Sequence, residues 1–413
     1  MPPTFVVVGA SLAGATAAAT LRAEGFEGHI TLIGAERHPP YERPPMSKRY
    51  LRGETPFEQA RIHPSGFYAD HRIEALFGIR ATRVEPAERV VHLDTGQRLR
   101  YDRLLIATGA RNRRPPIPGL DLAGVLDLRT LDDADVLRAH ATPAARAVVV
   151  GMGFIGCEVA ASLRQMGLEV VAVESSPAPL CGVLGRDIGA VVARLHRTHG
   201  VDLIVDDTVL RFEGHGRVSR VITRRGRCLE CDFVVAGLGV EPAVDFLATS
   251  GVGLSNGILV DEYCRSGAEG IYAAGDVANH LHPVFGRRIR VEHWQNAMQQ
   301  GAAAARNMLG PGRPYDAIHW FWSDQYDANL QYAGFHDEWD ALVVRGSLEA
   351  PSFLAFYLNQ GRIDAVVGLN CGKDVRRAMP LIRSRHFVDP ARLADEDTDL
   401  RSLVPVSATK GLT

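Results

Sequence analysis

The middle of the chain has the sequence VVVGMGFIGCE from Val148 to Glu158, and an alanine-rich segment follows it. The β-branched residues predict a buried strand, and the Gly-x-Gly-x-x-Gly spacing predicts a tight turn into a helix. The second glycine of such a turn lets the backbone approach a pyrophosphate, which then lies at the positive end of the helix. The stretch therefore predicts a dinucleotide-binding unit.

A second stretch of the same kind opens the chain. An apolar run at 5–8 leads into GASLAG from Gly9 to Gly14, and a helical pattern follows at 15–21. Ser11 replaces the second glycine, but serine is small and can still donate a hydrogen bond to phosphate. After a further strand predicted at 30–33, Glu36 suits a ribose diol. Taken alone, this stretch could also be a nucleotide-free strand, turn and helix.

The totals limit the class of protein. A length of 413 residues exceeds one compact core, so two or three domains are expected. A hydrophobic content of 46% and a net charge of −2 are ordinary for a globular protein, and neither points to nucleic acid or a membrane as partner. Six scattered cysteines favour a reducing, cytoplasmic location over a disulfide framework. The run at 5–21 is interpreted as strand and helix rather than a signal peptide, and no longer apolar run predicts a transmembrane helix.

A proline-rich loop follows the first unit, with the sequence PPYERPPMSK from Pro39 to Lys48. Its prolines predict a stiff, extended loop that is neither helix nor central strand, and Ser47 is expected to cap a following helix. Such a loop can hold Arg43 and Lys48 at fixed positions over a ligand. The segment YERPPMSK after a glycine fingerprint resembles the FAD-dependent, NADH-linked ferredoxin reductases of bacterial oxygenase systems.

This resemblance implies where FAD binds. A predicted strand at 101–106 ends in Ala-Thr-Gly, and one at 271–274 ends in Gly-Asp, whose carboxylate would hold the ribityl or phosphate region of FAD. An arginine in a Leu-Arg-Thr segment and the start of a helix near 292 also approach FAD in the family. Each of these segments, taken singly, is an ordinary strand end or helix start. The residues expected near FAD are Gly9, Ser11, Leu12, Ala13, Gly14, Glu36, Arg43, Lys48, Ala107, Thr108, Gly109, Arg129, Gly275, Asp276, Glu292, His293, Trp294 and Trp322.

The central fingerprint is then the NAD site. Glu174 ends the strand that follows the fingerprint helix, and its carboxylate can accept from both hydroxyls of a ribose. A carboxylate would repel a 2′-phosphate, and the neighbouring Ser175 and Ser176 supply no arginine, so NADH is preferred over NADPH. The residues expected to bind NAD are Gly151, Gly153, Phe154, Ile155, Gly156, Glu158, Glu174 and Gly239.

Two residues are expected to be catalytic, Lys48 and Glu158. A glutamate at the start of a helix is favourable by itself because it complements the helix dipole. The resemblance implies more: Glu158 faces the nicotinamide side and pairs with Lys48, which stabilises negative charge on the reduced flavin. No metal site is expected, since Cys228 and Cys231 have no second cysteine pair and would face opposite sides of a strand.

The predicted fold class is α/β, with two Rossmann-like domains and a small C-terminal α+β domain. The FAD domain is expected at 1–112 and 243–316, interrupted by the NAD domain at 113–242. The C-terminal interface domain is expected at 317–413, with strands at 330–334, 341–345, 353–358 and 363–369 and a helix near 375–383. The aromatic run at 320–322 indicates packing, and in the family it lies near the flavin.

The predicted function is transfer of a hydride from NADH to FAD, followed by transfer of single electrons to a small acidic two-iron, two-sulfur ferredoxin that feeds a monooxygenase or a ring-hydroxylating dioxygenase. Alternatives are a rubredoxin reductase or NADH oxidase on the same scaffold, or a redox sensor resembling apoptosis-inducing factor. The absence of any cysteine before Cys157 counts against a peroxidase. The candidates for ferredoxin docking, which could equally form a solvated face, are Arg287, Arg288, Arg290, Arg376, Arg377, Arg383 and Arg385.

Overall fold

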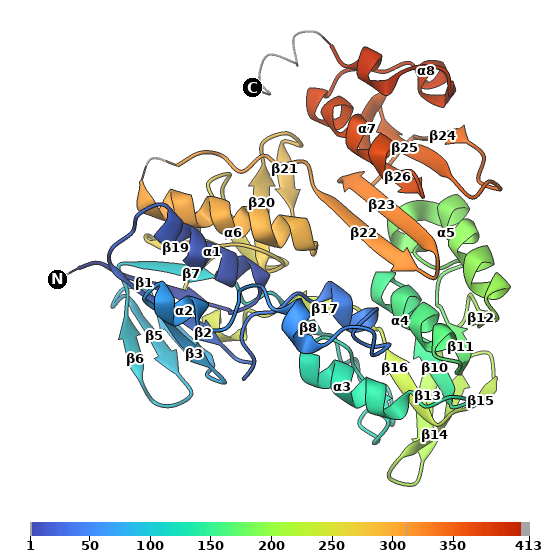
Figure 1. Cartoon of the computed structure of the whole chain (residues 1–413), viewed down its shortest axis with the longest axis horizontal. Helices are drawn as coiled ribbons and strands as arrows, with labels where there is room; N and C mark the ends of the chain where they lie inside the picture. Colours follow the sequence, from blue (N-terminus) through green and yellow to red (C-terminus); the bar gives the residue numbers. More distant parts are fainter. Residues whose placement is uncertain (1, 311, 406–413) are drawn as a thin grey trace. The chain divides into compact units, whose positions relative to one another are not determined.

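The computed structural model describes residues 2–310 and 312–405, which divide into two compact units (Figure 1). Unit 1 comprises 1–42, 57–111 and 240–319, and unit 2 comprises 43–56, 112–239 and the chain from 320 onward. The predicted division into three domains is finer than this grouping and stays a prediction. Residues 1, 311 and 406–413 of that prediction lie outside the described residues.

Unit 1 is built around a parallel sheet with the strand order β19-β7-β1-β2-β3. This order suits a doubly wound nucleotide-binding fold, in which ligands bind at the carboxyl ends of the strands. The elements of unit 1 are β1 (Thr4–Val8), α1 (Leu12–Ala23), β2 (His29–Gly34), η2 (Phe57–Ala60), α2 (Phe67–Asp70), β3 (Ile73–Phe77), β4 (Ala81–Glu85), β5 (Val90–Leu93), β6 (Arg98–Arg100), β7 (Arg103–Ile106), β8 (Ala110–Asn112), β17 (Val240–Pro242), η3 (Asp245–Leu247), β18 (Ile258–Val260), β19 (Ile271–Ala273), β20 (Ala278–His282), β21 (Arg287–Ile289) and α6 (Trp294–Leu309).

Small residues bring α1 and α6 together in unit 1. A Cβ added to Gly301 of α6 would lie 2.3 Å from the carbonyl oxygen of Ala13 in α1. The two helices therefore pack backbone to backbone, and Figure 1 shows them side by side. Both helices also pack on the parallel sheet, α1 against β1 and β2 and α6 against β7 and β19.

Unit 2 contains a second parallel sheet, β12-β11-β10-β16-β9, and an antiparallel sheet, β22-β23-β26-β25-β24. The α/β fold class with two Rossmann-like sheets and a C-terminal antiparallel sheet is confirmed. The elements of unit 2 are η1 (Pro44–Ser47), β9 (Val125–Leu126), α3 (Leu131–His140), β10 (Arg146–Val150), α4 (Phe154–Gln165), β11 (Glu169–Val173), α5 (Cys181–Thr198), β12 (Asp202–Ile204), β13 (Val209–Gly214), β14 (Val218–Thr223), β15 (Cys228–Glu230), β16 (Phe233–Ala236), β22 (Trp320–Gln325), β23 (Ala328–Gly334), β24 (Ala341–Gly346), β25 (Phe353–Asn359), β26 (Arg362–Leu369), α7 (Gly372–Ser384), α8 (Pro390–Ala394) and η4 (Leu400–Leu403).

The proline-rich loop differs from its prediction in two ways. Its residues Pro44–Ser47 form a 3₁₀ turn, because proline at the first helical positions loses no hydrogen bond. Ser47 ends this turn and caps no helix; its hydroxyl donates instead to Glu158. The stiffness that the prolines predicted is therefore provided by a helical turn rather than by an extended chain.

The structure explains the start of α3 and confirms the prediction for the two neighbouring cysteines. Thr130 caps α3 in a capping box with Asp133, each side chain bonding the other residue's backbone N–H. Cys228 is exposed whereas Cys231 is buried, as expected for residues on opposite faces of an extended segment. Burial raises the pKa of the Cys231 thiol to about 11, which fits a structural role.

Among the described residues, no helix combines the length and the apolar character that crossing a bilayer requires.

A buried histidine of unit 1 predicts acid sensitivity. His280 in β20 is 2% exposed, with the rings of His282 and Tyr315 at centroid distances of 5.4 Å. Burial lowers the pKa of His280 to about 3. Below about pH 6.5 this histidine therefore binds a proton in the unfolded chain but stays neutral in the folded chain. The contribution of this residue to the free energy of unfolding is fully present above pH ~6.5. It decreases as the pH drops toward 3, and at pH 5 about 2 kcal/mol of it is lost.

Calorimetry should show a weaker fall in melting temperature between pH 7 and 5 for His280→Phe than for the wild type. The exposed control His386→Gln should follow the wild type; equal slopes in all three proteins would contradict the assignment.

Candidate functional site

The glycine turn of unit 2 has the geometry of a dinucleotide cradle. A Cβ on Gly156 would lie 1.9 Å from the carbonyl oxygen of Gly151, so only glycine lets the helix α4 start so close to β10. A Cβ on Gly153 would meet nothing within 4 Å, and this residue is exposed at the N-cap of α4 without a side-chain cap. The turn thus presents open backbone at a helix N-terminus, which fits a pyrophosphate.

Glu174 lies beside this turn and is 8% exposed. Its carboxylate accepts the backbone N–H of Met152 at 2.7 Å through Oε2 and that of Ser176 at 2.7 Å through Oε1. The side chain therefore stabilises the glycine turn through both of its oxygens. The neighbouring residue, Ser175, is exposed and carries no charge.

The fingerprint of unit 1 has a matching geometry. A Cβ on Gly14 would lie 1.8 Å from the carbonyl oxygen of Gly9, and one on Gly9 would lie 2.2 Å from that of Ala107. Ser11 is the N-cap of α1 but its hydroxyl forms no capping bond. Gly275 packs on α1, since its Cβ would be 3.1 Å from Cβ of Ala13. The structure thus brings three of the predicted FAD segments to one end of the sheet.

The other predicted FAD residues are held by local bonds within their own units. Glu36 accepts a hydrogen bond from Tyr41, and Thr108 donates to the carbonyl of Ala243 at 2.8 Å. In unit 2, the Arg43 guanidinium donates to the carbonyl of Arg129. Glu292, His293 and Trp294 lie at the start of α6, where His293 is the N-cap. Asp276 follows Gly275, and its backbone carbonyl accepts from Arg290 at 3.1 Å.

Lys48 and Glu158 form a buried ion pair in unit 2. The Lys48 Nζ lies 3.0 Å from Glu158 Oε1, and the two side chains are 10% and 5% exposed. Asp324 lies 4.0 Å from the same ammonium, and the Trp322 ring centroid lies 5.7 Å from it. The predicted pairing between the proline-rich loop and the fingerprint helix is therefore present in the structure.

The proline-rich loop is fastened to α4 at two adjacent turns of the helix. Ser47 donates to the Glu158 carboxylate, and its carbonyl accepts from Ser162 Oγ at 2.7 Å. The hydroxyl of Tyr50 also donates to Asp135 of α3 at 2.6 Å. These bonds fix the position of Lys48, which follows Ser47 directly.

Charge at Glu158 is set by competing effects. Burial raises the pKa of Glu158, while the Lys48 ammonium and the hydroxyls of Ser47 and Ser323 lower it and so partly offset burial. Separating the pair would leave a buried charge without compensation, which typically costs about 3–5 kcal/mol. The two residues therefore act as one electrostatic unit.

Comparison with known proteins identifies the family. The family model for pyridine nucleotide-disulphide oxidoreductases matches residues 3–301, and the model for reductase C-terminal domains matches residues 320–404. The chain belongs to this family. Rhodocoxin reductase of Rhodococcus erythropolis is 37% identical over 96% of this chain and 93% of its own length. The ferredoxin–NAD(+) reductase component of the anthranilate 1,2-dioxygenase system of Burkholderia cepacia is 38% identical over 97% of this chain and 99% of its own.

A solved structure shows the same architecture. Putidaredoxin reductase, in its covalent complex with putidaredoxin, matches with a TM-score of 0.95 at 33% identity, covering 98% of this chain and 99% of its own. The predicted resemblance is confirmed, and with it the assignment as an oxidoreductase that uses FAD and NAD(H).

This pyridine nucleotide-disulphide oxidoreductase has no exposed thiol near its fingerprint helix in the described residues. Cys157 is fully buried, and burial raises its pKa well above the usual range. Its Sγ lies 3.4 Å from the carbonyl oxygen of Met152. The residue therefore packs the helix against the turn and is not a redox thiol.

Two residues of this family member were missed as site residues, Ser323 and Gln325. Both lie on β22 and are buried, together with Phe321. Alternate residues of a strand face the same side, so the buried face of β22 combines one aromatic and two polar side chains. Polar residues at these positions were the available signal, because a buried hydroxyl or amide needs a hydrogen-bonding partner.

Two glycines of the turn in unit 2 are expected to affect different properties, one the affinity for NAD⁺ and the other the melting temperature. Gly153→Ala should keep the wild-type melting temperature, because its Cβ enters open space, yet weaken NAD⁺ binding at least about tenfold by blocking the pyrophosphate. Gly156→Ala should lower the melting temperature because its Cβ overlaps the Gly151 carbonyl. Calorimetry and NAD⁺ titration measure both effects, with Gly182→Ala of α5 as an unobstructed control. Unchanged NAD⁺ affinity in Gly153→Ala would remove this turn from the binding site.

Proposed function

We propose that the chain is an NADH-dependent ferredoxin reductase of the cytoplasm. Its partner would be a small acidic two-iron, two-sulfur ferredoxin that feeds a monooxygenase or a ring-hydroxylating dioxygenase. The observation that supports this most directly is the buried Lys48–Glu158 pair on the fingerprint helix. The names of its relatives support a ferredoxin as the electron acceptor.

FAD, when bound, supplies the conversion of a two-electron transfer into single-electron transfers. The chain's own residues bind, orient and set the charge. Gly9, Gly14, Glu36, Arg43, Arg129 and Asp276 would hold FAD, and Gly151, Gly153, Gly156 and Glu174 would hold NADH. Lys48 would provide a fixed positive charge that offsets the negative charge that FAD takes up when it accepts the hydride. Such preorganised charge acts strongly because its burial excludes water.

Glu158 keeps that positive charge in place. It accepts from the Ser47 hydroxyl through Oε2 and from the Ser323 hydroxyl through Oε1, and it pairs with Lys48. No nucleophile or general base is needed, since hydride transfer breaks no bond to a protein group. The protein's contribution is therefore orientation and electrostatics.

The arginines predicted to dock a ferredoxin differ in how exposed they are and in the ion pairs that they already form. Arg290 has a side chain that is 12% exposed and pairs with Glu292, and Arg385 pairs with the buried Asp364. Arg376 and Arg377 are exposed on α7, although Arg377 also contacts Asp374 at 2.8 Å. We propose Arg376 and Arg377 as part of the surface that steers an acidic ferredoxin.

A panel of purified ferredoxins tests the proposed function. The flavoprotein should reduce an acidic two-iron, two-sulfur ferredoxin rapidly with NADH, and the rate should fall as salt increases. The variant Arg376→Glu/Arg377→Glu should lower kcat/KM for ferredoxin about tenfold at low salt without slowing FAD reduction by NADH. Arg220→Glu, an exposed reversal on β14, is the control. Oxygen consumption without ferredoxin would favour an oxidase, and slow turnover with every ferredoxin would favour a redox sensor.

A further inference from the structure

A line of hydrogen bonds runs from Glu158 into helix α5. Ser323 Oγ donates to Glu158 Oε1 at 2.7 Å, and Gln325 Nε2 donates to Ser323 Oγ at 3.2 Å. The Gln325 Oε1 lies 3.0 Å from Nε2 of His196, whose Nδ1 lies 3.2 Å from the Tyr326 hydroxyl. The line therefore joins the fingerprint helix, the C-terminal sheet and α5 within unit 2.

The chemistry of these groups requires all donors in the line of hydrogen bonds to point the same way. An amide oxygen can only accept, so His196 must carry its proton on Nε2 and donate to Gln325. Its Nδ1 then has a lone pair, which accepts from the Tyr326 hydroxyl. From Tyr326 to Ser323, every hydroxyl, ring or amide donor points toward Glu158. Successive bonds of this kind polarise one another, which strengthens the last donor, Ser323.

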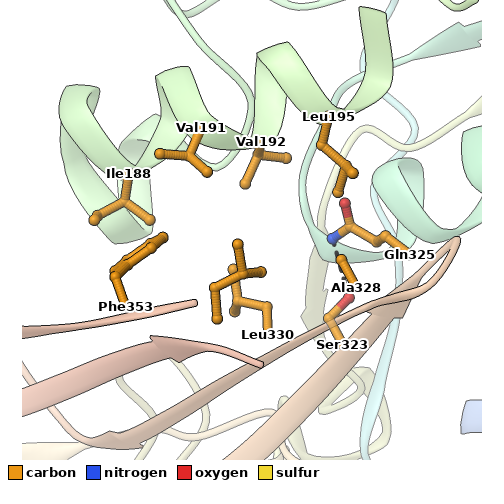
Figure 2. Close-up of a pocket in the computed structure, with 10 residues that line it drawn as sticks. Ile188, Val191, Val192, Leu195, Ser323, Gln325, Ala328, Leu330 and Phe353 are labelled. Atoms are coloured by element: carbon orange, nitrogen blue, oxygen red, sulfur yellow. Dashed lines mark hydrogen bonds between the residues drawn. The ribbon is translucent and has the colours of Figure 1, made fainter. Parts of the chain in front are cut away.

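These hydrogen-bonding groups are buried, which keeps water from competing for their donors and acceptors. His196 is fully buried, and Ser323 and Gln325 are 1% and 2% exposed. Burial lowers the pKa of His196 to about 4, so the imidazole is neutral near pH 7. Figure 2 shows Ser323 and Gln325 at one end of an apolar contact between α5 and the sheet, which Ile188, Val192 and Leu195 form from the helix side. Apart from Ser323 and Gln325, the described residues that line this contact are apolar.

We propose that His196 is a positioning residue for the nicotinamide site: through Gln325 and Ser323 it keeps the Glu158 carboxylate ionised and turned toward Lys48. The inference rests on the role of Glu158 in the proposed function. It adds a residue of α5 that belongs to neither glycine fingerprint and whose side chain makes no hydrogen bond or ion pair with Glu158 or Lys48.

Other titratable groups face the two ends of the line. Glu158 adjoins Lys48 and the Cys157 thiol, with Asp324 within 4.0 Å of Lys48. His196 adjoins His199 and Tyr326, and Arg164 acts on the Tyr326 hydroxyl. The experiment must therefore report the protonation of Glu158 itself rather than a pH profile of turnover alone.

Infrared titration of the FAD-loaded protein, without NADH or ferredoxin, provides this readout. The protonated-carboxyl band of Glu158 is assigned by its loss in Glu158→Gln. In His196→Leu the midpoint for protonation of Glu158 should rise by at least about half a pH unit, a threefold change in the protonation constant. His196→Gln, whose amide can still donate to Gln325, should stay close to the wild type. Gln325→Met should match His196→Leu, and the double variant should shift no further.

Three results would overturn the inference: an unchanged midpoint in His196→Leu, equal shifts in the Leu and Gln variants, or additive shifts in the double variant. Thermal melting checks that each variant folds. If His196→Leu does not fold, Gln325→Met cuts the same line from the sheet side, and an unchanged midpoint there overturns the inference equally. Because the titration needs no electron acceptor, failure of the ferredoxin panel leaves this result readable.

Discussion

Replacing Lys48 with methionine is expected to slow reduction of the bound FAD by NADH about 10²-fold in stopped flow, with FAD content retained. The reason is electrostatic: the Lys48 ammonium is a buried, fixed positive charge, 10% exposed and 3.0 Å from Glu158. Loss of one preorganised charge at a reaction centre commonly costs about 10²–10³ in rate. Lys373→Met at the exposed start of α7 is the matched control and should keep the wild-type rate.

The single variant also destabilises the protein, because Glu158 then lacks its counter-charge. A second variant, Lys48→Met/Glu158→Gln, separates the two effects. Removal of both charges should restore much of the melting temperature, since no uncompensated charge stays buried. The rate of FAD reduction should remain low. A wild-type rate in either variant would exclude Lys48 from the mechanism.

The second large effect concerns the choice between NADH and NADPH. Glu174→Gln/Ser175→Arg should shift the ratio of kcat/KM for NADPH over NADH by about 10² or more in favour of NADPH. Removing the carboxylate ends its repulsion of a 2′-phosphate, and like charges brought together cost several kcal/mol. The exposed Ser175 gives an arginine room to reach the phosphate.

Glutamine is preferred over alanine at this position because Glu174 also braces the glycine turn. Its two carboxylate oxygens accept the N–H groups of Met152 and Ser176; a glutamine keeps one acceptor oxygen at this place, whereas an alanine would leave both N–H groups without an acceptor. Ser175→Arg alone is the control, since Glu174 can then neutralise the new guanidinium. Steady-state kinetics with both nucleotides measure the shift. An unchanged preference for NADH over NADPH in the double variant would mean that Glu174 does not bind the ribose.

Much of the fold follows from local patterns. The first and last glycines of each fingerprint are required for steric reasons, because a Cβ added to any of them would overlap a backbone carbonyl. Four strands of the C-terminal sheet were predicted because their apolar residues make a continuous run between turns, whereas the strand β22 was interpreted only as a packing segment. The contact of Lys48 with Glu158 was predicted from resemblance alone, since no local pattern joins residues that far apart in sequence.

The part that could not be predicted depends on tertiary packing. Serine is a residue type that commonly caps helices, so a cap was predicted at Ser47. In the structure α4 packs against this residue, and its hydroxyl donates to Glu158 instead. His196 belongs to an amphipathic helix, where a histidine is unremarkable until the sheet brings Gln325 to its ring. A buried polar line of this kind is assembled from several elements, so its members become visible only when the elements are packed together.

The packing of α1 on α6 has a consequence for how the protein is made. The two helices begin at Leu12 and Trp294, so roughly 280 residues are synthesised between them. At about 5–20 residues per second, α1 leaves the ribosome roughly 15–60 s before its partner exists. During that interval its small-residue face has nothing to cover it. Unit 1 must therefore complete its folding late in translation, after all of the NAD site has been made, and a truncated chain that ends before α6 should expose α1 to chaperones and proteases.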